Sequence, residues 1–248
     1  MTKLVQRKDE LGQLGHSFNT MAERISALLT NQQRLLRDIS HELRSPLARA
    51  QLALGLAERT QTLQQLPRIS QELERLDSML DELLTYSKLD AGQYVLDKQQ
   101  LDLTALTTDV MALNQVEADA KQQQLAINTS QPLYLHADQR LLARAIENIL
   151  RNAIKYSPPH STVNCQLQQQ QGQLLLQICD QGPGLAETQL HAIFEPLYRV
   201  SDSRDNQTGG TGLGLAIVAQ IIRQHGGSVS ASNSAGGGLC ISLKLPLH

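Results

Sequence analysis

Four short groups of residues in this 248-residue chain have types and spacings that suit phosphoryl-transfer chemistry. The first group holds Asn148, Asn152, Lys155 and Tyr156, and its spacing places the two amides and the lysine along one side of a helix. Amide oxygens are hard neutral ligands of the kind that Mg²⁺ accepts beside phosphate oxygens. A lysine adds a positive charge for phosphate. A solvated polar helix face has the same composition, so this group alone leaves both interpretations open.

The second group runs from Asp180 to Gly184 and directly follows the apolar run 174–179. An acid at the end of a strand can accept a hydrogen bond from an exocyclic amine. Gly182 and Gly184 would let the backbone approach a flat ring closely. An ordinary turn uses the same residue types, and it remains the alternative for this group taken by itself.

The third group opens a helix predicted for residues 214–225, and its members are Gly210, Thr211, Gly212, Leu213 and Gly214. Glycine-rich backbone at a helix N-terminus presents N–H groups and the positive end of the helix dipole to phosphate. The group follows a polar segment, 201–208, and not a strand, which disfavours a Rossmann dinucleotide site. A flexible segment at that place would suit a lid over a nucleotide.

The fourth group surrounds His41, within Ser40-His41-Glu42-Leu43-Arg44-Ser45-Pro46-Leu47. Glu42 can accept a ring proton and leave a nucleophilic nitrogen on His41, and Ser45, one turn further on, can position a water. The helical wheel puts His41 and Ser45 opposite an apolar arc, and therefore toward solvent. That arc consists of Leu36, Ile39, Leu43, Leu47, Ala50 and Leu54.

The elements that position these groups differ between the two parts of the chain. Up to about residue 90 the apolar spacing predicts helices: a narrow coiled-coil-like seam at 11–25, a helix over 31–58 that Pro46 should kink, and a second helix over 69–87 that starts near Pro67. Two antiparallel helices with narrow apolar seams are best buried as a dimeric four-helix bundle.

Beyond residues 90–100 the pattern predicts an α/β domain with helices on one face of a mixed sheet. Strands are expected at 125–128, 163–167, 174–179, 228–231 and 239–245, and helices at 103–123, 138–156 and 214–225. The glutamine-rich stretch 166–171 is interpreted as a hairpin connection.

Composition excludes several classes of protein. The net charge of −2 argues against nucleic acid or an anionic membrane surface as the main partner. Cys165, Cys179 and Cys240 form no CxxC pair, so a disulfide framework or a zinc site is not expected and a reducing compartment fits best. No run approaches the roughly 20 apolar residues of a membrane span, so the chain is expected to be soluble. Helical pattern begins directly after Met1-Thr2-Lys3, and this abrupt start suggests a cut inside a longer protein.

The order and spacing of the four groups resemble those of the histidine kinase family over residues 31–248, and residues 1–30 look like the end of a HAMP linker. His41 to Pro46 looks like the H box, Asn148 to Tyr156 the N box, and Asp180 to Gly184 the G1 box. Phe194-Glu195-Pro196-Leu197-Tyr198-Arg199 looks like the F box and Gly210 to Gly214 the G2 box. Within the family, the chain is similar to sensors of envelope stress in Gram-negative bacteria.

The resemblance implies a role for each matching residue. His41 would accept the phosphoryl group, Glu42 would be its general base, and Ser45 would orient water when a phosphorylated regulator is dephosphorylated. Asn148 and Asn152 would hold Mg²⁺. The remaining residues would bind ATP: Lys155 and Arg199 through phosphate, Tyr156 beside the base, Asp180 through the adenine amine, Gly182 and Gly184 around the ring, and Gly210, Thr211, Gly212, Leu213 and Gly214 in the lid and phosphate contacts.

The resemblance also implies the organisation and activity of the chain. Residues 1–30 would end a HAMP signalling helix, 31–92 would form the dimerisation and phosphotransfer hairpin, and 98–248 would form a Bergerat-type ATP-binding α/β sandwich. The protein would be a homodimeric protein histidine kinase that passes its phosphoryl group to a response regulator receiver domain and also dephosphorylates it. The full-length protein would lie on the cytoplasmic side of the bacterial inner membrane, held there only by an N-terminal region outside this chain.

Two other readings share part of the pattern. A chaperone-type or mismatch-repair-type ATPase would need the Asn148, Asp180 and Gly212 groups but no exposed His41 on a helical hairpin. A helical scaffold without enzymatic activity would need none of the nucleotide-binding groups. ATP binding without an acid-labile phosphoprotein would favour the first, and no nucleotide binding would favour the second.

Overall fold

The computed structural model describes residues 10–60, 62–129, 131–170, 172–200, 210–234 and 236–247. Two compact units make up the chain, Met1–Leu76 and Asp77–His248, and each is described by itself. The segment 201–208, which was predicted to form a lid, lies outside the described residues, as do the side chains of Leu11 and Leu14 in the predicted seam.

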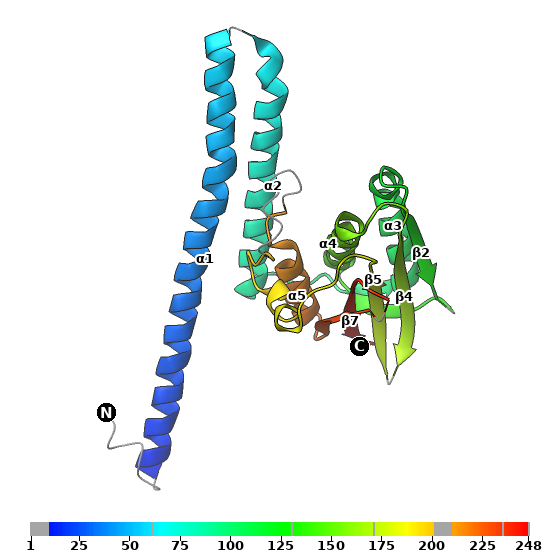
Figure 1. The fold of residues 1–248 in the computed structure, drawn as a ribbon. Helices are drawn as coiled ribbons and strands as arrows, with labels where there is room; N and C mark the ends of the chain where they lie inside the picture. Colours follow the sequence, from blue (N-terminus) through cyan, green and yellow to red (C-terminus); the bar gives the residue numbers. More distant parts are fainter. Residues whose placement is uncertain are drawn as a thin grey trace. The chain divides into compact units, whose positions relative to one another are not determined.

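Two long helices form the hairpin that the apolar spacing predicts (Figure 1). Helix α1 spans Glu10–Thr60 without a break at Pro46, and helix α2 spans Leu66–Asp90. The short 3₁₀ helix η1, Leu63–Gln65, joins them, and the hydroxyl of Thr62 caps it by accepting from Gln64 N at 3.3 Å. Pro67 lies in the first turn of α2, where its missing N–H removes no helix bond.

A five-stranded mixed sheet is the framework of the second unit, with strand order β2-β4-β5-β7-β6. Its strands are β2 Gln124–Asn128, β4 Thr162–Gln170, β5 Gln173–Cys179, β6 Ser228–Asn233 and β7 Leu239–Pro246. β2 and β4 are parallel, and the other neighbours are antiparallel. All five predicted strands are therefore present, in a sheet of the predicted mixed type.

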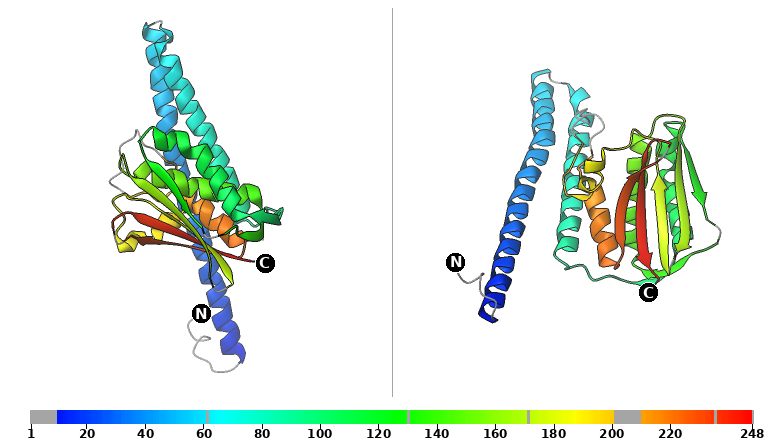
Figure 2. Two further views of the ribbon diagram at one scale, coloured as in Figure 1. Left: turned by 90° about the vertical axis from the view of Figure 1, so that its right-hand side faces the viewer. Right: turned by 60° about the horizontal axis from the view of Figure 1, so that its bottom comes forward.

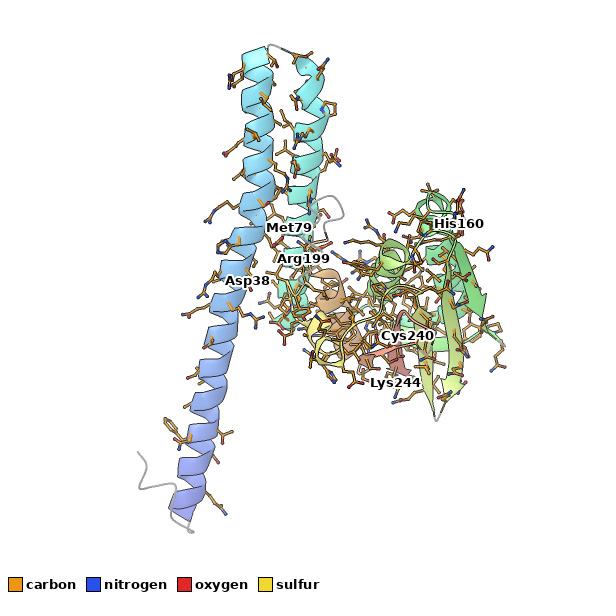
Figure 3. The ribbon with its side chains drawn as sticks, viewed as in Figure 1. Asp38, Met79, His160, Arg199, Cys240 and Lys244 are labelled. Carbon is orange, nitrogen blue, oxygen red and sulfur yellow. A yellow bond between two sulfur atoms is a disulfide. The ribbon has the colours of Figure 1, made fainter. Side chains whose placement is uncertain are left out.

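Three helices cover one face of this sheet: α3 Leu103–Asp119, α4 Gln139–Tyr156 and α5 Gly214–Gln224 (Figure 2). Alternate residues of β5, such as Leu174, Leu176 and Ile178, are buried beneath the helices, whereas Gln177 and Cys179 are only half-buried. Apolar side chains from both layers fill the space between helices and sheet (Figure 3). The predicted α/β arrangement is confirmed.

Aspartates set the first residues of two of these helices. Asp102 Oδ1 accepts from Thr104 N at 2.9 Å and from Ala105 N at 3.1 Å, which caps α3. Asp138 Oδ1 accepts from Leu141 N at 3.1 Å and caps α4 in the same way.

Several elements differ from the sequence-based expectation. Strands β1, Gln99–Asp102, and β3, Tyr134–Ala137, form a separate two-stranded antiparallel sheet that was not predicted. Two 3₁₀ turns, η2 at Glu187–Gln189 and η3 at Ala192–Phe194, were also not predicted. The glutamine-rich stretch is mostly strand and not a connection, because Gln166 to Gln170 pair with β5 in register.

The expectation of no disulfide is also wrong. Cys179 on β5 and Cys240 on β7 are opposite each other in the sheet register and are joined by a disulfide, with their Cα atoms 4.0 Å apart. Residue spacing could not reveal this pair, because the two cysteines meet only after β5 and β7 become neighbours. Cys165 is free and buried in the core.

Candidate nucleotide-binding and phosphoacceptor sites

Helix α4 carries the first predicted group. Its buried side packs on the sheet, while Asn148, Asn152 and Lys155 are half-buried and Tyr156 is exposed. The ammonium of Lys155 lies 4.8 Å from the centre of the Tyr156 ring. The one-sided placement predicted from the spacing is therefore present, with the opposite side of the helix in the core.

The C-terminal end of α4 is held by two side chains that the sequence did not single out. Lys121 Nζ donates to the carbonyl oxygens of Ile154 and Lys155, at 2.8 and 2.6 Å. Gln123 Nε2 donates to Ser157 O at 3.0 Å. A cation at a helix C-terminus offsets the negative end of the dipole, so Lys121 and Gln123 anchor the turn that carries Lys155 and Tyr156.

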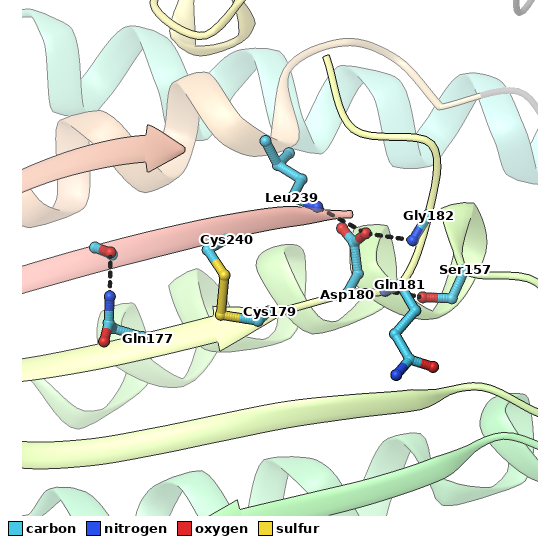
Figure 4. The surroundings of a disulfide bond; sticks show 9 residues. Ser157, Gln177, Cys179, Asp180, Gln181, Gly182, Leu239 and Cys240 are labelled. Atoms are coloured by element: carbon cyan, nitrogen blue, oxygen red, sulfur yellow. Dashed lines mark hydrogen bonds between the residues drawn. A yellow bond between two sulfur atoms is a disulfide. The ribbon is translucent and has the colours of Figure 1, made fainter. Parts of the chain in front are cut away.

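Asp180 lies where β5 ends and is held by backbone on both sides (Figure 4). Its Oδ1 accepts from Gly182 N at 2.8 Å and from Leu239 N at 3.0 Å, and its own N donates to Leu239 O at 2.9 Å. Burial raises the pKa of the Asp180 carboxyl, and the two hydrogen bonds partly oppose that shift. Among the residues that the structure describes, Oδ2 has no hydrogen-bond partner, so it can accept from an amine.

Gly238 allows strand β7 to reach Asp180. Its φ is +95°, and a Cβ at this position would clash with Asp180 O, so a larger residue would push the strand away. Neither Gly238 nor Leu239 was predicted to belong to the site. The only sequence signal was the glycine run 236–238 just before a strand, which is also typical of an ordinary turn.

The Asp180 loop meets the end of α4. A Cβ at Gly182 would lie 2.8 Å from Tyr156 O, and Gln181 N donates to Ser157 Oγ at 3.3 Å. Two groups that lie 24 residues apart along the chain, at Ser157 and Gln181, are therefore in direct contact.

The glycine-rich group at the start of α5 completes the cluster. A Cβ at Gly210 would lie 3.4 Å from Lys155 Nζ, and a Cβ at Gly214 would lie 3.5 Å from Asn148 Oδ1. Asn148 Nδ2 also donates to Gly214 O at 3.3 Å. The structure therefore brings the first three predicted groups together at one end of the sheet.

Thr211 and Leu213 shape the turn between Gly210 and α5. Thr211 Oγ1 accepts from Leu213 N at 3.1 Å and donates to Glu82 at the C-terminal part of α2, within the same unit. Leu213 is fully buried and anchors this turn in the core.

The segment before the undescribed stretch also reaches this cluster. Leu197 N donates to Gly212 O at 3.0 Å, and a Cβ at Gly212, whose φ is +76°, would lie 2.9 Å from Leu197 Cα. Arg199 is half-buried two residues further along this segment. The backbone at Leu197 is thus fixed against the glycine-rich turn.

His41 and its neighbours lie on α1, in the first unit. His41 and Ser45 are exposed, as the helical wheel predicts, and Glu42 is half-buried. Arg49 Nη1 donates to Ser45 Oγ at 2.7 Å, a contact that the sequence-based interpretation did not include.

The convergent residues fit a nucleotide and a divalent cation. A carboxylate oxygen with open acceptor capacity suits an adenine amine, and the amides of Asn148 and Asn152 offer neutral oxygens of the kind that Mg²⁺ accepts. Lys155 and the N–H groups at the start of α5 supply positive charge for phosphates.

Comparisons with known proteins agree with this geometry. Residues 137–248 match the family model described as Histidine kinase-, DNA gyrase B-, and HSP90-like ATPase. Residues 31–92 match the His Kinase A (phospho-acceptor) domain, and residues 3–27 match the HAMP domain. The solved structure of the mycobacterial sensor histidine kinase MprB is 31% identical, with a TM-score of 0.52, and covers 60% of this chain and 97% of its own. This chain belongs to the histidine kinase family.

Two other relatives are similar to this histidine kinase over most of its chain. The sensor histidine kinase CpxA of Escherichia coli K12 is 39% identical over 236 residues, which is 94% of this chain and 51% of CpxA. The chain thus spans about half the length of that relative. Full-length ShkA in complex with AMPPNP is 27% identical, with a TM-score of 0.65, over 86% of this chain and 45% of ShkA.

The family assignment carries two direct consequences. The second unit contains an ATPase domain of the ATP-binding type that histidine kinases share with DNA gyrase B and HSP90. The hairpin belongs to the phosphoacceptor family. Among the described residues, no helix is both long and apolar enough to cross a membrane.

Proposed function

We propose that this histidine kinase transfers the γ-phosphoryl group of ATP to His41 and then to an aspartate of a response regulator receiver domain. The observation that carries the proposal is the meeting of Asn148, Asp180 and the Gly210–Gly214 turn at one end of the sheet. These three groups are distant in sequence and have no common structural need, so a shared ligand is the simplest reason for their convergence.

Each convergent residue would have a defined part in ATP binding. Asp180 Oδ2 accepts from the adenine amine, and Gly182 and Gly184 keep the adjoining backbone close to the ring. Tyr156 flanks the base, and Lys155 and Arg199 bind phosphate oxygens. The N–H groups of the turn from Gly210 through Thr211, Gly212 and Leu213 to Gly214 cap the phosphates at the positive end of α5.

Asn148 and Asn152 would hold Mg²⁺ through their amide oxygens. When bound, the ion neutralises charge on the phosphate oxygens during transfer. This assignment is supported by the half-buried placement of both amides one helical turn apart on α4. The complex of ShkA with AMPPNP supports a triphosphate nucleotide as the ligand of the related domain.

His41 would act as the nucleophile. Glu42 withdraws the proton from one ring nitrogen, so that the other nitrogen can attack phosphorus in line with the leaving ADP oxygen. The exposure of His41 supports this role, because both the nucleotide-binding domain and a regulator need access to it. Ser45 would orient a water that hydrolyses the phosphoryl aspartate of the regulator, which makes the protein a phosphatase as well.

The hairpin would dimerise into a four-helix bundle. Leu36, Leu47 and Leu54 on α1 are 58%, 47% and 49% exposed, and Leu73 on α2 is 53% exposed. Leucines placed on one arc of a helix are costly to leave in water, at roughly 25 cal/mol per Å² of apolar surface. A second copy of the hairpin would cover them.

The proposed domain boundaries are 1–30 for the end of a HAMP signalling helix, 31–92 for the phosphotransfer hairpin and 98–248 for the ATP-binding domain. We place the full-length protein at the cytoplasmic side of the bacterial inner membrane, as a sensor of the envelope-stress type. The identity to CpxA supports this placement.

Incubation with Mg²⁺ and γ-labelled ATP tests the proposal directly. We expect acid-labile, alkali-stable label on the chain and none on a His41→Gln variant that still binds ATP. Label on the variant would move the acceptor to another residue. ATP binding and hydrolysis without labelled protein would instead favour an ATPase. Transfer is then tested by adding purified receiver domains to the labelled chain.

A further inference from the structure

Arg49 connects the two helices of the hairpin to the hydroxyl of Ser45. Its Nε donates to Glu72 Oε1 at 2.6 Å and its Nη2 donates to Glu72 Oε2 at 2.8 Å. The third nitrogen, Nη1, donates to Ser45 Oγ at 2.7 Å. All three nitrogens of one guanidinium are therefore engaged, two of them across the hairpin and one along α1.

The ion pair is held more firmly than a surface pair. The side chains of Arg49 and Glu72 are only 23% and 13% exposed, and their two parallel hydrogen bonds define the plane of the guanidinium. The hydrogen bond from Arg49 lowers the pKa of the Glu72 carboxyl, so this carboxylate stays charged at neutral pH. Glu72 therefore fixes the direction in which Nη1 points.

Ser45 differs from three other hydroxyls of α1. Thr30, Ser40 and Thr60 each donate to the carbonyl four residues earlier, at 2.8, 2.8 and 2.7 Å, as hydroxyls in helices commonly do. The hydrogen bond that the structure describes for Ser45 comes from Arg49 instead. Arginine has no acceptor, so Ser45 Oγ accepts and keeps its own proton and one lone pair for another partner.

We propose that Arg49 is the positioning residue for Ser45 in hydrolysis of the phosphoryl aspartate on the response regulator. The inference rests on the phosphatase activity proposed above. Arg49 holds the Ser45 hydroxyl away from the helix backbone, so that the remaining lone pair and proton face a water. Glu72 on α2 supports this arrangement, which makes the position of the hydroxyl depend on how α2 packs against α1.

The hydrolysis that this arrangement serves is balanced without another reactant. The water oxygen forms a bond to phosphorus while the bond from phosphorus to the aspartate oxygen breaks. The electron pair leaves with the aspartate carboxylate, and the protons of the water end on inorganic phosphate and solvent. Ser45 orients the water and Arg49 orients Ser45, and neither forms a covalent bond.

A double-mutant cycle on the full 248-residue chain tests the inference. The variants are Ser45→Ala, Arg49→Met and the two combined, with Arg59→Met as a matched exposed arginine on the same helix. The substrate is a receiver domain that was shown to accept label from the phosphorylated chain. For the assay, the aspartate of this receiver domain is phosphorylated chemically with phosphoramidate. Inorganic phosphate release is measured at saturating receiver domain, so that kcat is separated from KM.

We expect Arg49→Met to lower phosphatase kcat about tenfold, because a displaced hydroxyl orients the water poorly. The same substitution in the Ser45→Ala background should lower kcat less than twofold further. Arg49→Lys should restore little of the lost phosphatase kcat, since one ammonium group cannot bind both Glu72 oxygens and Ser45 together. Arg59→Met should leave the rate as in the unmodified chain.

A purely structural role would give a different result. If Arg49→Met lowers kcat equally with and without the Ser45 hydroxyl, or not at all, the inference is overturned. Glu72→Gln provides a second variant that keeps Arg49, and thermal unfolding checks that each variant folds. If Ser45→Ala hydrolyses the phosphoryl aspartate at the unmodified rate, or the unmodified chain does not hydrolyse it, the phosphatase proposal itself fails, and the Arg49 inference fails with it.

Discussion

The side-chain amide of Asn233 bonds both backbone groups of Leu185, its N–H and its carbonyl. Its Oδ1 accepts from Leu185 N at 2.9 Å and its Nδ2 donates to Leu185 O at 2.6 Å. Asn233 ends the edge strand β6, and Leu185 directly follows the loop from Asp180 to Gly184. The amide therefore fixes the far end of the loop that the proposed adenine site depends on.

We expect Asn233→Ala to weaken ATP binding about tenfold. Each lost hydrogen bond costs roughly 0.5–1.5 kcal/mol, and binding must then also order the freed loop. Calorimetric titration with a non-hydrolysable ATP analogue measures the effect. Ser232→Ala, one residue earlier on the same strand, is the control and should bind normally. Normal affinity in Asn233→Ala would show that the loop is ordered without this contact.

Asp180→Asn should separate ligand binding from stability. The amide oxygen can still accept from Gly182 N and Leu239 N. The amide NH₂ would then face the adenine amine, and two hydrogen-bond donors cannot bond each other. We expect at least a tenfold loss of ATP affinity, on the order of the 1.5–3 kcal/mol of a hydrogen bond to a charged group. The free energy of unfolding at pH 7 should be equal or higher, because the buried charge is gone.

The wild-type chain should also lose ATP affinity as the pH falls through the raised pKa of Asp180, since the protonated oxygen no longer accepts well. The affinity of Asp180→Asn should not follow that pH dependence. Asp109→Asn, an exposed acid on α3, controls for the loss of one charge. Unchanged affinity in Asp180→Asn would contradict the assignment of adenine to this carboxylate.

His225 should make the stability of the second unit depend on pH. The ring is 4% exposed, its Nδ1 donates to Ile221 O at 2.8 Å, and its Nε2 accepts from Asp138 N at 3.1 Å, which requires the neutral form. Burial lowers the pKa of His225 from its ordinary value of 6.5. The unfolded chain therefore binds this proton at a higher pH than the folded chain does.

The free energy of unfolding should consequently fall as the pH drops below about 6.5, by up to roughly 1.4 kcal/mol per pH unit until the folded-state pKa is reached. Urea denaturation at a series of pH values measures the slope. His225→Gln should be less stable at pH 7.5 but should lose this slope, whereas the exposed His136→Gln should keep it. An identical slope in His225→Gln would assign the dependence to other groups.

The Cys179–Cys240 disulfide should stabilise the second unit. It joins residues 61 apart in sequence. Closing a loop of that length lowers the entropy of the unfolded chain and raises the free energy of unfolding by about 4 kcal/mol. Dithiothreitol should lower the free energy of unfolding by that order in the unmodified chain and in Cys165→Ala. The double variant Cys179→Ala with Cys240→Ala should not respond to the reductant.

Cys165 is a suitable control because burial raises the pKa of its thiol to about 12, which keeps it protonated and unreactive. A stability that does not change on addition of dithiothreitol would show that the two thiols are not linked under the conditions of the measurement.

Much of the fold was predictable because its signals are local. The i, i+4 spacing of Asn148 and Asn152 needs only the pitch of one helix, and the glycine run before Leu215 needs only the start of one helix. The apolar periodicity of α1 likewise placed His41 toward solvent before any packing was known. The short strands β1 and β3 were missed because four residues carry too little periodicity to distinguish a strand from a loop.

The sequence by itself therefore determined the types of element, the family to which their order belongs, and the residues with suitable chemistry. Only the tertiary structure decided which of those residues meet. The contacts of Asp180 with Leu239, Asn233 with Leu185, and Arg49 with Glu72 all depend on strand order or on the register of a hairpin. These follow from how distant apolar faces bury one another, and no local pattern along the chain records that choice.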